Sequence, residues 1–428
     1  MKNVADVIIE GIDELVTVDP GDDTREEGDL GLIRDGAVAL GGGEILAVGR
    51  SREITETYRL TKGGMRLNGQ GQVLLPGFVD PHTHVVFGGS REHEFEMRIC
   101  GSSYQEIAAR GGGIRATVSA VRQTPAEELL EAGLRRLDRM LCYGTTTAEA
   151  KSGYGLSLES EIKLLEVARD LNDRHPVDLV STFLGAHEVP EEYVHRKEEY
   201  IDLLVDEMIP EVVRRDLAEF CDVFCEEGVY TREESRRILS SASKAGLKPK
   251  IHADEFTNQK GAELAVEIGA TSADHLLAIS GQGLNALRES RVIPVLLPGT
   301  CFSLGLDSYA PAREMLQWGL KVALGTDLNP GSSMTESMPM ITTLACVMLH
   351  MTPAEAIVGA TLNAALAVDR ADQVGSVTQG KKADLILLDM PSFRYLPYHY
   401  GVNLVDKVIK NGRLVVDGGR RVQHGDNP

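Results

Sequence analysis

QVLLPGFVDPHTH, at residues 72–84, is the most informative stretch of the 428-residue chain. Its apolar run is typical of a buried β-strand, and the run ends in polar residues that include two histidines. His82 and His84 are two positions apart, so strand periodicity places both imidazoles on one face. Imidazole nitrogen suits zinc and divalent iron. The stretch therefore predicts a strand that carries two ligands to one metal ion.

Seven further apolar runs of β character follow this stretch. They are TTTAEA (145–150), VDLVSTFLGA (177–186), CDVFCEE (221–227), LKPKIHADE (247–255), ATSADH (270–275), VIPVLLPG (292–299) and KVALGTD (321–327). Helical segments fill most of the gaps, so the alternation predicts an α/β fold with a closed, TIM-like (β/α)8 barrel. An open, doubly wound sheet is the alternative. It is disfavoured because no Gly-rich phosphate loop follows the first run.

Both ends of the chain have β character of another kind. The first part alternates, as in VIIEGIDELVTV, and Asn411-Gly412 between two apolar runs predicts a hairpin near the other end. We expect the two ends to combine into one small β-sandwich domain built from residues 1–75 and 371–428. The barrel would then occupy residues 76–370, which exceeds the roughly 250 residues that such a barrel needs.

His, Asp and Glu residues end most of the eight runs, and chance solvation of loops does not predict that preference. The later runs end in His187, His252, Glu255, His275 and Asp327. In a barrel, the carboxyl ends of all strands open onto one face. His82, His84, His252 and Asp327 together would leave one ligand position open for water, as a catalytic metal site requires.

The composition excludes several classes of partner. A net charge of −20 argues against nucleic acid and anionic membranes, and it means that an anionic substrate needs a local cation. No apolar run approaches the ~18 residues of a membrane span. The first residues lack a signal-peptide pattern, so we expect a cytoplasmic protein. The six scattered cysteines indicate reduced thiols, and we expect Cys221 and Cys225 to be buried rather than metal ligands.

PGFVDPHTH resembles the first-strand signature of the amidohydrolase superfamily, whose members pair a distorted barrel with a β-sandwich from both termini. The resemblance extends over nearly the whole chain, since His252, His275 and Asp327 follow in the order that the superfamily shows. Seven motifs together resemble the imidazolonepropionase family within it. They are HTHVVFGGSREHEFEMR, YQEIAARGGGIRATV, EAKSGYGL, FLGAHEVPEEY, HADEF, SADHL and TDLNPGSS.

This narrower resemblance implies hydrolysis of 4-imidazolone-5-propanoate to N-formimidoyl-L-glutamate. It implies that Arg91 binds the propanoate, for which a guanidinium is well shaped. An ion pair of Arg91 with Glu92 or Glu94 is the structural alternative. The other substrate-binding positions that it implies are Tyr154, His187, Glu255, Asn329, Gly331 and Ser332. For the last three, a tight Gly-Pro turn is an equally plain explanation.

The expected chemistry uses one divalent metal ion, zinc or iron, that makes hydroxide available near neutral pH. Asp327, His275 and Glu255 are the candidate acid–base residues, and the sequence leaves open which of them is the general base. Glu255 is three residues after His252, so strict alternation would place it on the opposite face of the strand. For Glu255 to reach the site, it must therefore lie where the strand has become a loop. Lys151 begins the segment KSGYG, which resembles the pattern of single-metal imidazolonepropionases. We therefore predict one metal ion and no carboxylated lysine.

Three other functions agree less well with these motifs. A guanine or cytosine deaminase-like enzyme would share the ligand set but would not need Arg91. A catalytically dead scaffold should have lost ligands, and a sugar-phosphate barrel enzyme would need a stronger phosphate loop than LLPGT or NPGSS provides. Relatives often have an acidic residue where this chain has Ser90, which affects how Arg91 is oriented. We also expect a homodimer, the commonest symmetric oligomer.

Overall fold

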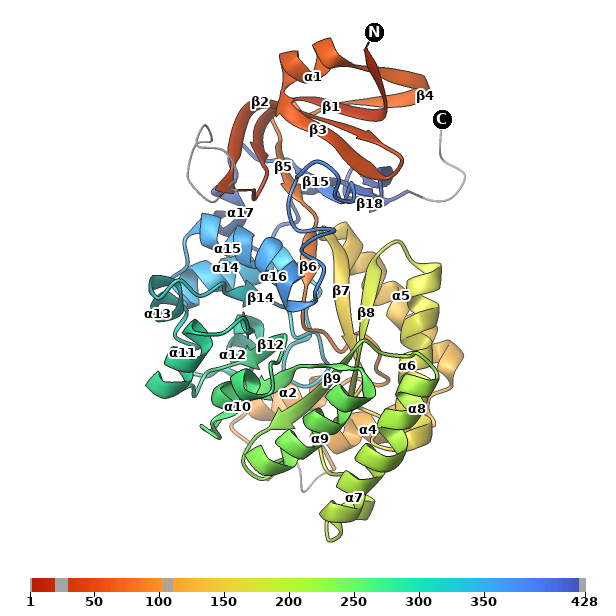
Figure 1. Cartoon of the computed structure of the whole chain (residues 1–428), viewed down its shortest axis with the longest axis vertical. Helices are drawn as coiled ribbons and strands as arrows, with labels where there is room; N and C mark the ends of the chain where they lie inside the picture. Colours follow the sequence, from red (N-terminus) through yellow and green to blue (C-terminus); the bar gives the residue numbers. More distant parts are fainter. Residues whose placement is uncertain (1, 20–29, 103–105, 107–110, 423–428) are drawn as a thin grey trace. The chain divides into compact units, whose positions relative to one another are not determined.

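All eight predicted β runs form strands of one parallel sheet in the computed structural model (Figure 1), which describes residues 2–19, 30–102, 106 and 111–422. The strands are β6 (Phe78–Asp80), β7 (Thr145–Lys151), β8 (Asp178–Ala186), β9 (Phe220–Cys225), β11 (Ile251–Ala253), β12 (Ser272–His275), β13 (Ile293–Leu296) and β14 (Ala323–Leu324). Their spatial order follows the sequence from β6 to β14, and the short β10 (Lys248–Pro249) also pairs with β9.

The two edges of this sheet meet just beyond β6 and β14. The amide of His84 donates to the carbonyl of Leu328 at 2.9 Å, and the amide of Asp327 donates to the carbonyl of His82 at 3.0 Å. Thr83 and Leu328 form a parallel bridge. The sheet is therefore a nearly closed barrel, as predicted, and the segments that close it carry three of the expected metal ligands.

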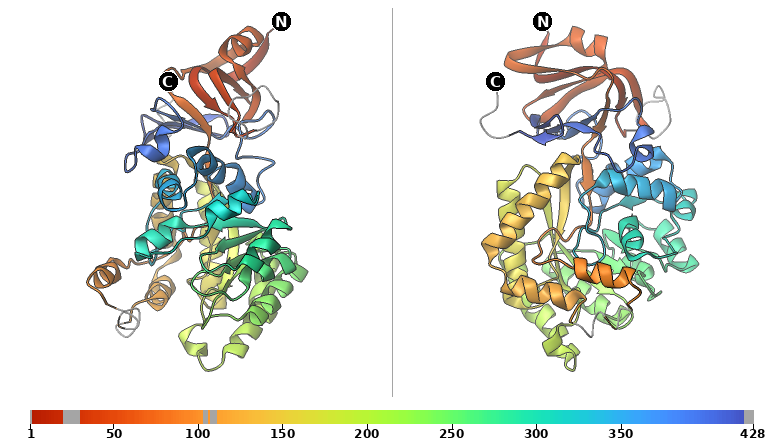
Figure 2. Two further views of the ribbon diagram at one scale, coloured as in Figure 1. Left: turned by 90° about the vertical axis from the view of Figure 1, so that its left-hand side faces the viewer. Right: turned by 180° about the vertical axis from the view of Figure 1, so that it is seen from behind.

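Helices follow most of the barrel strands. Their bounds are α2 (Glu92–Ile99), α4 (Ile114–Gln123), α5 (Ala126–Cys142), α6 (Leu158–Arg174), α7 (Lys197–Leu203), α8 (Ile209–Arg214), α9 (Arg232–Ala245), α10 (Gly261–Glu267), α11 (Gly281–Arg288), α12 (Pro298–Leu304), α13 (Ala312–Gln317), α14 (Met338–Met348), α15 (Pro353–Gly359) and α16 (Leu362–Ala367). Helix α6 packs on β8 and α9 packs on β9, outside the sheet (Figure 2). A capping box of Thr231 and Glu234 begins α9, and Gly246 ends it in the left-handed conformation.

The two ends of the chain form a second sheet together. Its strands are β1 (Asn3–Val16), β2 (Leu32–Gly41), β3 (Glu44–Arg50), β4 (Tyr58–Asn68), β5 (Val73–Pro76), β15 (Leu385–Leu388), β16 (Val405–Lys410), β17 (Arg413–Asp417) and β18 (Arg420–Arg421), with α1 at Ser51–Thr57 and α17 at Tyr395–Tyr398. Strand β5 lies between β1 and β15, so it joins the two termini. Asn411 and Gly412 both have positive φ and form the predicted hairpin turn between β16 and β17.

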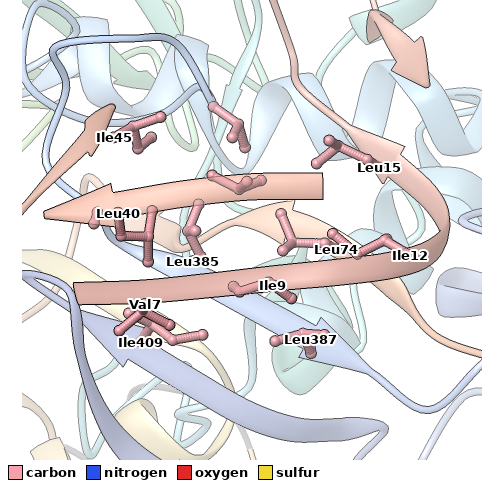
Figure 3. Packing of buried hydrophobic residues seen from close by; sticks show 13 residues of the cluster. Val7, Ile9, Ile12, Leu15, Leu40, Ile45, Leu74, Leu385, Leu387 and Ile409 are labelled. Atoms are coloured by element: carbon pink, nitrogen blue, oxygen red, sulfur yellow. The ribbon is translucent and has the colours of Figure 1, made fainter. Parts of the chain in front are cut away.

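Alternate residues of these strands fill the core of the terminal sheet (Figure 3). Ile9 on β1, Leu74 on β5 and Leu385 on β15 are fully buried and belong to one cluster. This cluster contains side chains from both ends of the chain. Burial of apolar surface contributes about 25 cal/mol for each Å², so the shared core explains why the ends combine.

The described residues form two compact units. One comprises the described residues within 1–80, 138–147 and 337–428, and the other comprises those within 81–137 and 148–336. Every predicted site residue belongs to the second unit. The domain boundaries predicted at 75/76 and 370/371 stay a prediction. No described helix is both long and apolar enough to cross a bilayer.

Candidate functional site

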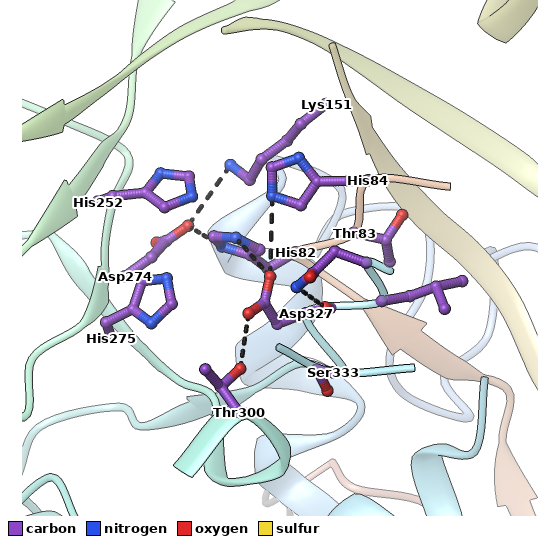
Figure 4. A network of polar contacts seen from close by, with 12 residues as sticks. His82, Thr83, His84, Lys151, His252, Asp274, His275, Thr300, Asp327 and Ser333 are labelled. Atoms are coloured by element: carbon purple, nitrogen blue, oxygen red, sulfur yellow. Dashed lines mark hydrogen bonds and ion pairs between the residues drawn. The ribbon is translucent and has the colours of Figure 1, made fainter. Parts of the chain in front are cut away.

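The four predicted metal ligands lie together inside the barrel (Figure 4). Asp327 Oδ1 is 3.4 Å from His82 Nε2 and 3.7 Å from His84 Nε2. The ring centroids of His82 and His252 are 4.5 Å apart. The ligand atoms of His82, His84 and Asp327 all lie within 4.8 Å of one another, and so do those of His82, His252 and His275.

The donor set has the features that a metal ion requires. His82 Nε2 is buried and has no hydrogen-bond partner among the described residues, whereas His82 Nδ1 is 2.6 Å from Asp274 Oδ2. His252 Nδ1 lies 3.0 Å from Asp222 Oδ2 as an ion-pair contact, although it forms no hydrogen bond among the described residues. A ligating imidazole needs this arrangement, with one nitrogen held by a carboxylate and the other free to bind. The residues therefore fit a divalent ion.

Burial sets the protonation of the cluster. Burial, followed by the charges of Lys151 and the neighbouring imidazoles, holds the pKa of His82 well below its ordinary value. Burial likewise lowers the pKa of His84 and His275. Neutral imidazole is the form that binds metals. Burial raises the pKa of Asp327 to about 6. The hydrogen bond that Asp327 accepts from Thr300 at 2.6 Å lowers this pKa and so partly offsets the effect of burial.

A cavity of about 600 Å³ opens above the cluster, and all seven residues predicted to bind substrate line it. His84, His252, His275 and Asp327 line the same cavity. The structure thus places three of the four predicted ligands, the acid–base residues and the substrate-binding residues around one space, and His82 is buried beside it. Part of the predicted motif YQEIAARGGGIRATV lies outside the described residues.

Arg91 forms the ion pair that the sequence left as an alternative. Its Nε and Nη2 donate to the two carboxylate oxygens of Glu94 at 3.0 and 2.7 Å. Glu94 is buried and also accepts from the amide of Gly113 at 3.1 Å. This clamp fixes the guanidinium at the cavity, where Nη1 faces Gly331 so closely that a Cβ there would overlap it. The ion pair is therefore compatible with a binding role, because it holds the donor fork in place.

Tyr154 and His187 lie beside the proposed metal ligands. The His187 ring stacks on the His84 ring with centroids 5.0 Å apart, and the ring centroids of Tyr154 and His187 are 5.2 Å apart. The buried carboxylate of Glu161 accepts from the amides of Gly153, Gly155 and Leu156, so it fixes the loop that carries Tyr154. Burial lowers the pKa of His187 to about 3, which keeps this ring neutral.

Glu255 reaches the cavity because the chain turns before it. Asp254 has φ +50° and accepts from the amides of Gln259, Gly261 and Ala262, so strand alternation ends there. Glu226 accepts from the amides of Phe256 and Thr257 and from the Thr257 hydroxyl, which fixes the loop on the other side. Strict alternation would have placed Glu255 on the wrong face. The turn brings its carboxylate 3.6 Å from His275 Nδ1.

The side-chain amide of Asn329 forms its hydrogen bonds within its own loop. Its Oδ1 accepts from the amides of Gly331 and Ser332, and its Nδ2 donates to the carbonyl of Asp327 and to the Ser332 hydroxyl. These bonds use both donors and both lone pairs of the amide. The tight-turn explanation thus accounts for Asn329, which lines the cavity and shapes the loop around Arg91.

Several residues of the site were not singled out from the sequence. Arg98, Glu161, Asp222 and Thr300 touch or support the predicted residues. Asp222 lies in the middle of β9 between Cys221 and Val223, which are both buried. A charged residue in the centre of an apolar strand was the signal that could have identified it. Cys221 and Cys225 are buried, as expected.

Comparisons with known proteins agree with this geometry. A model of the amidohydrolase family matches residues 73–415. The chain is 49% identical over 420 residues to an imidazolonepropionase of Alkaliphilus metalliredigens (strain QYMF), covering 97% of this chain and 99% of that one. It is 52% identical over 394 residues to an imidazolonepropionase of Geobacillus kaustophilus (strain HTA426), covering 92% of each.

A solved structure supports the fold. A zinc-bound adenosine deaminase from Xanthomonas campestris superposes with a TM-score of 0.72 over 99% of this chain and 96% of that chain, at 18% identity. That level of identity bears on the fold alone. The family match and the high identity of the relatives carry the assignment further. The chain belongs to the amidohydrolase family and, within it, groups with the imidazolonepropionases.

Proposed function

We propose that the chain hydrolyses 4-imidazolone-5-propanoate to N-formimidoyl-L-glutamate with one divalent metal ion, zinc or iron, held by His82, His84, His252 and Asp327. The observation that carries the proposal is the position of a clamped arginine in the same cavity as this ligand set. A nucleobase deaminase of the same superfamily would not need that arginine. Relatives at about 50% identity over most of the chain support the same substrate.

Arg91 binds the propanoate in this proposal. Glu94 holds two of its nitrogens, so Nη1 and the remaining Nη2 hydrogen are available to the carboxylate. Arg98 also lines the cavity. The single negative charge of Glu94 cannot balance the positive charges of both Arg91 and Arg98. These two arginines are the cations with which an anionic substrate would pair in this cavity, whose lining also includes Glu94, Glu188, Glu226, Glu227, Glu255 and Asp327.

In the hydrolysis, a water oxygen bonds to the ring carbonyl carbon, the ring C–N bond breaks, and the nitrogen takes up a proton. A divalent ion at the ligand set lowers the pKa of water and polarises a carbonyl. Asp327 is placed to accept the proton of the attacking water, and Glu255 is placed to deliver one to the leaving nitrogen. Burial and then the charges of Asp327 and Glu226 hold the pKa of Glu255 well above its ordinary value, which suits a proton donor.

Lys151 supports a single-metal site. Although burial opposes it, the carboxylates of Asp222 and Glu149 raise the pKa of Lys151 above its ordinary value. The amine is therefore charged, and only a neutral amine reacts to form a carbamate. We infer one metal equivalent for each chain and no carboxylated lysine.

The test is turnover of 4-imidazolone-5-propanoate by the purified protein, followed by the loss of imidazolone ultraviolet absorbance with and without chelator. Guanine, cytosine and a decarboxylated imidazolone are the comparison substrates. We expect chelator-sensitive turnover of the propanoate substrate alone, with about one zinc or iron for each chain. Turnover of a nucleobase alone, or no bound metal, would overturn the proposal.

We further propose that the protein is a homodimer and acts in the cytoplasm. The dimer follows from the frequency of twofold oligomers and not from a contact within the chain. Sedimentation equilibrium measures it directly, because a dimer doubles the 46.4 kDa mass of the chain. A single species of monomer mass at micromolar concentration would contradict the dimer.

A further inference from the structure

Five charged side chains lie fully buried beside the histidine cluster. They are Glu149, Lys151, Asp222, Lys250 and Asp274. Isolated buried charges are strongly unfavourable, and a group of this size persists only if its members satisfy one another. None of the five has a chemical step in the proposed reaction. Their contacts indicate what they do instead.

Lys151 is surrounded by three carboxylates. Its Nζ lies 2.6 Å from Asp222 Oδ2, 3.0 Å from Glu149 Oε2 and 3.5 Å from Asp274 Oδ2. The ammonium donates a hydrogen bond to Asp222, and its contacts with Glu149 and Asp274 are ion pairs. Because the three carboxylates come from β7, β9 and β12, one ammonium connects three barrel strands.

Two of these carboxylates also hold histidines. Asp222 Oδ2 is 3.0 Å from His252 Nδ1, and Asp274 Oδ2 is 2.6 Å from His82 Nδ1. In both cases the oxygen that faces the histidine is the one that faces Lys151. The second oxygen of each is fixed separately. Asp222 Oδ1 accepts from the amide of His252 at 3.1 Å, and Asp274 Oδ1 accepts from the Ser272 hydroxyl at 2.6 Å.

We propose that Lys151 is a positioning residue for metal binding, which holds Asp222 and Asp274 against Nδ1 of His252 and His82. The His82 ring then carries the Nδ1 proton and presents Nε2 to the metal. The Asp222 carboxylate faces His252 Nδ1 from 3.0 Å and would fix that ring in the same way in the metal-bound protein. A hydrogen bond to the distal nitrogen fixes the tautomer and the orientation of a ligating imidazole. The inference rests on the proposed ligand set and adds that one lysine controls two of its members.

Lys250 is the natural comparison within the same group. Its Nζ lies 2.8 Å from Glu149 Oε1 and donates to the carbonyl of Pro81 at 3.1 Å. It is as buried as Lys151, yet its ion pair is with a carboxylate that holds neither ligand. Lys410 is a second comparison. It pairs with Asp384 at 2.6 Å, with both side chains 2% exposed, in the terminal sheet.

The experiment compares zinc affinity in Lys151→Met and Lys410→Met by competition with a chromophoric chelator. We expect Lys151→Met to bind zinc 10–100-fold more weakly, the usual effect of losing support behind a metal ligand. Lys410→Met loses a buried ion pair of the same length and should keep its affinity within about twofold. The cobalt-substituted proteins add a spectroscopic readout, because a changed ligand orientation alters the visible absorption of Co²⁺ in Lys151→Met alone.

The outcomes separate this inference from the proposed function. Wild-type protein that binds neither zinc nor iron would overturn both. Wild-type affinity and an unchanged cobalt spectrum in Lys151→Met would overturn the positioning role and leave the metal site intact. If Lys151→Met does not fold, Asp222→Ala and Asp274→Ala test the same contacts, because each removes a carboxylate that lies between Lys151 and a histidine. Unchanged zinc affinity in both would overturn the inference.

Discussion

Gly331 tests the role of Arg91 without altering any charge. A methyl group at this position would overlap Arg91 Nη1, so the guanidinium would have to leave its place at the cavity. We expect Gly331→Ala to raise the KM for 4-imidazolone-5-propanoate about tenfold, since small displacements of binding groups are costly. Metal content should not change. Steady-state kinetics beside Gly281→Ala, where the added methyl meets open space, provides the measurement and its control. An unchanged KM would separate Arg91 from substrate binding.

Glu255 connects the site to the stability of the fold. Burial raises its pKa well above the ordinary value of about 4.3, so the folded state binds its proton more tightly than the unfolded state does. Its contribution to stability is therefore complete below about pH 4 and is lost as pH rises through the raised pKa. In metal-free protein, Glu255→Gln should increase the free energy of unfolding by about 1 kcal/mol or more at pH 8 and by little at pH 4. Urea denaturation at both values checks this, and an equal difference at both would contradict it.

At the scale of single elements, apolar runs predicted strands well because a barrel buries both faces of each strand. All eight runs became strands, and the polar residues at their ends, from His82 to Asp327, lie at one site. Alternation failed where a strand ends early. Strand β11 stops at Ala253, and the positive φ of Asp254 depends on amides up to eight residues further on. This turn depends on contacts within the folded loop. Residue spacing alone therefore could not predict that the Glu255 side chain faces the cavity.

The loop after β11 yields a prediction of its own. Because the Glu226 carboxylate holds Phe256 and Thr257, its removal should loosen Glu255 while His252 stays on its strand. We expect Glu226→Ala to lower kcat tenfold or more with metal content unchanged. Glu233→Ala, which removes an exposed carboxylate on the neighbouring α9, should leave kcat within about twofold. A loss of metal in Glu226→Ala would show that the carboxylate supports the ligands instead.

Across the whole molecule, the sequence indicated that the two ends would combine but not how. The prediction rested on β character at both ends and on the resemblance. Strand β5 settles the arrangement, since it pairs in parallel with β1 and antiparallel with β15. The pairing of β5 with β15 joins residues more than 300 positions apart, and only tertiary packing determines its register. The same limit applies to Asp222 and Asp274, whose partners are spatial neighbours far away in the sequence.

Metal removal should therefore act on one part of the molecule. All four proposed ligands lie in the unit of residues 81–137 and 148–336, and they follow or belong to three strands, β6, β11 and β14. An ion that binds only the folded state at 100–1,000 times its Kd stabilises that state by about 3–4 kcal/mol. Chelation should thus speed amide exchange in β11 and β12, and it should leave β1 and β16 unchanged. Hydrogen exchange followed by mass spectrometry, with and without chelator, makes this comparison within one sample. Equal acceleration in both units would mean that the ion stabilises the chain as a single cooperative structure, because the ligands themselves belong to only one of them.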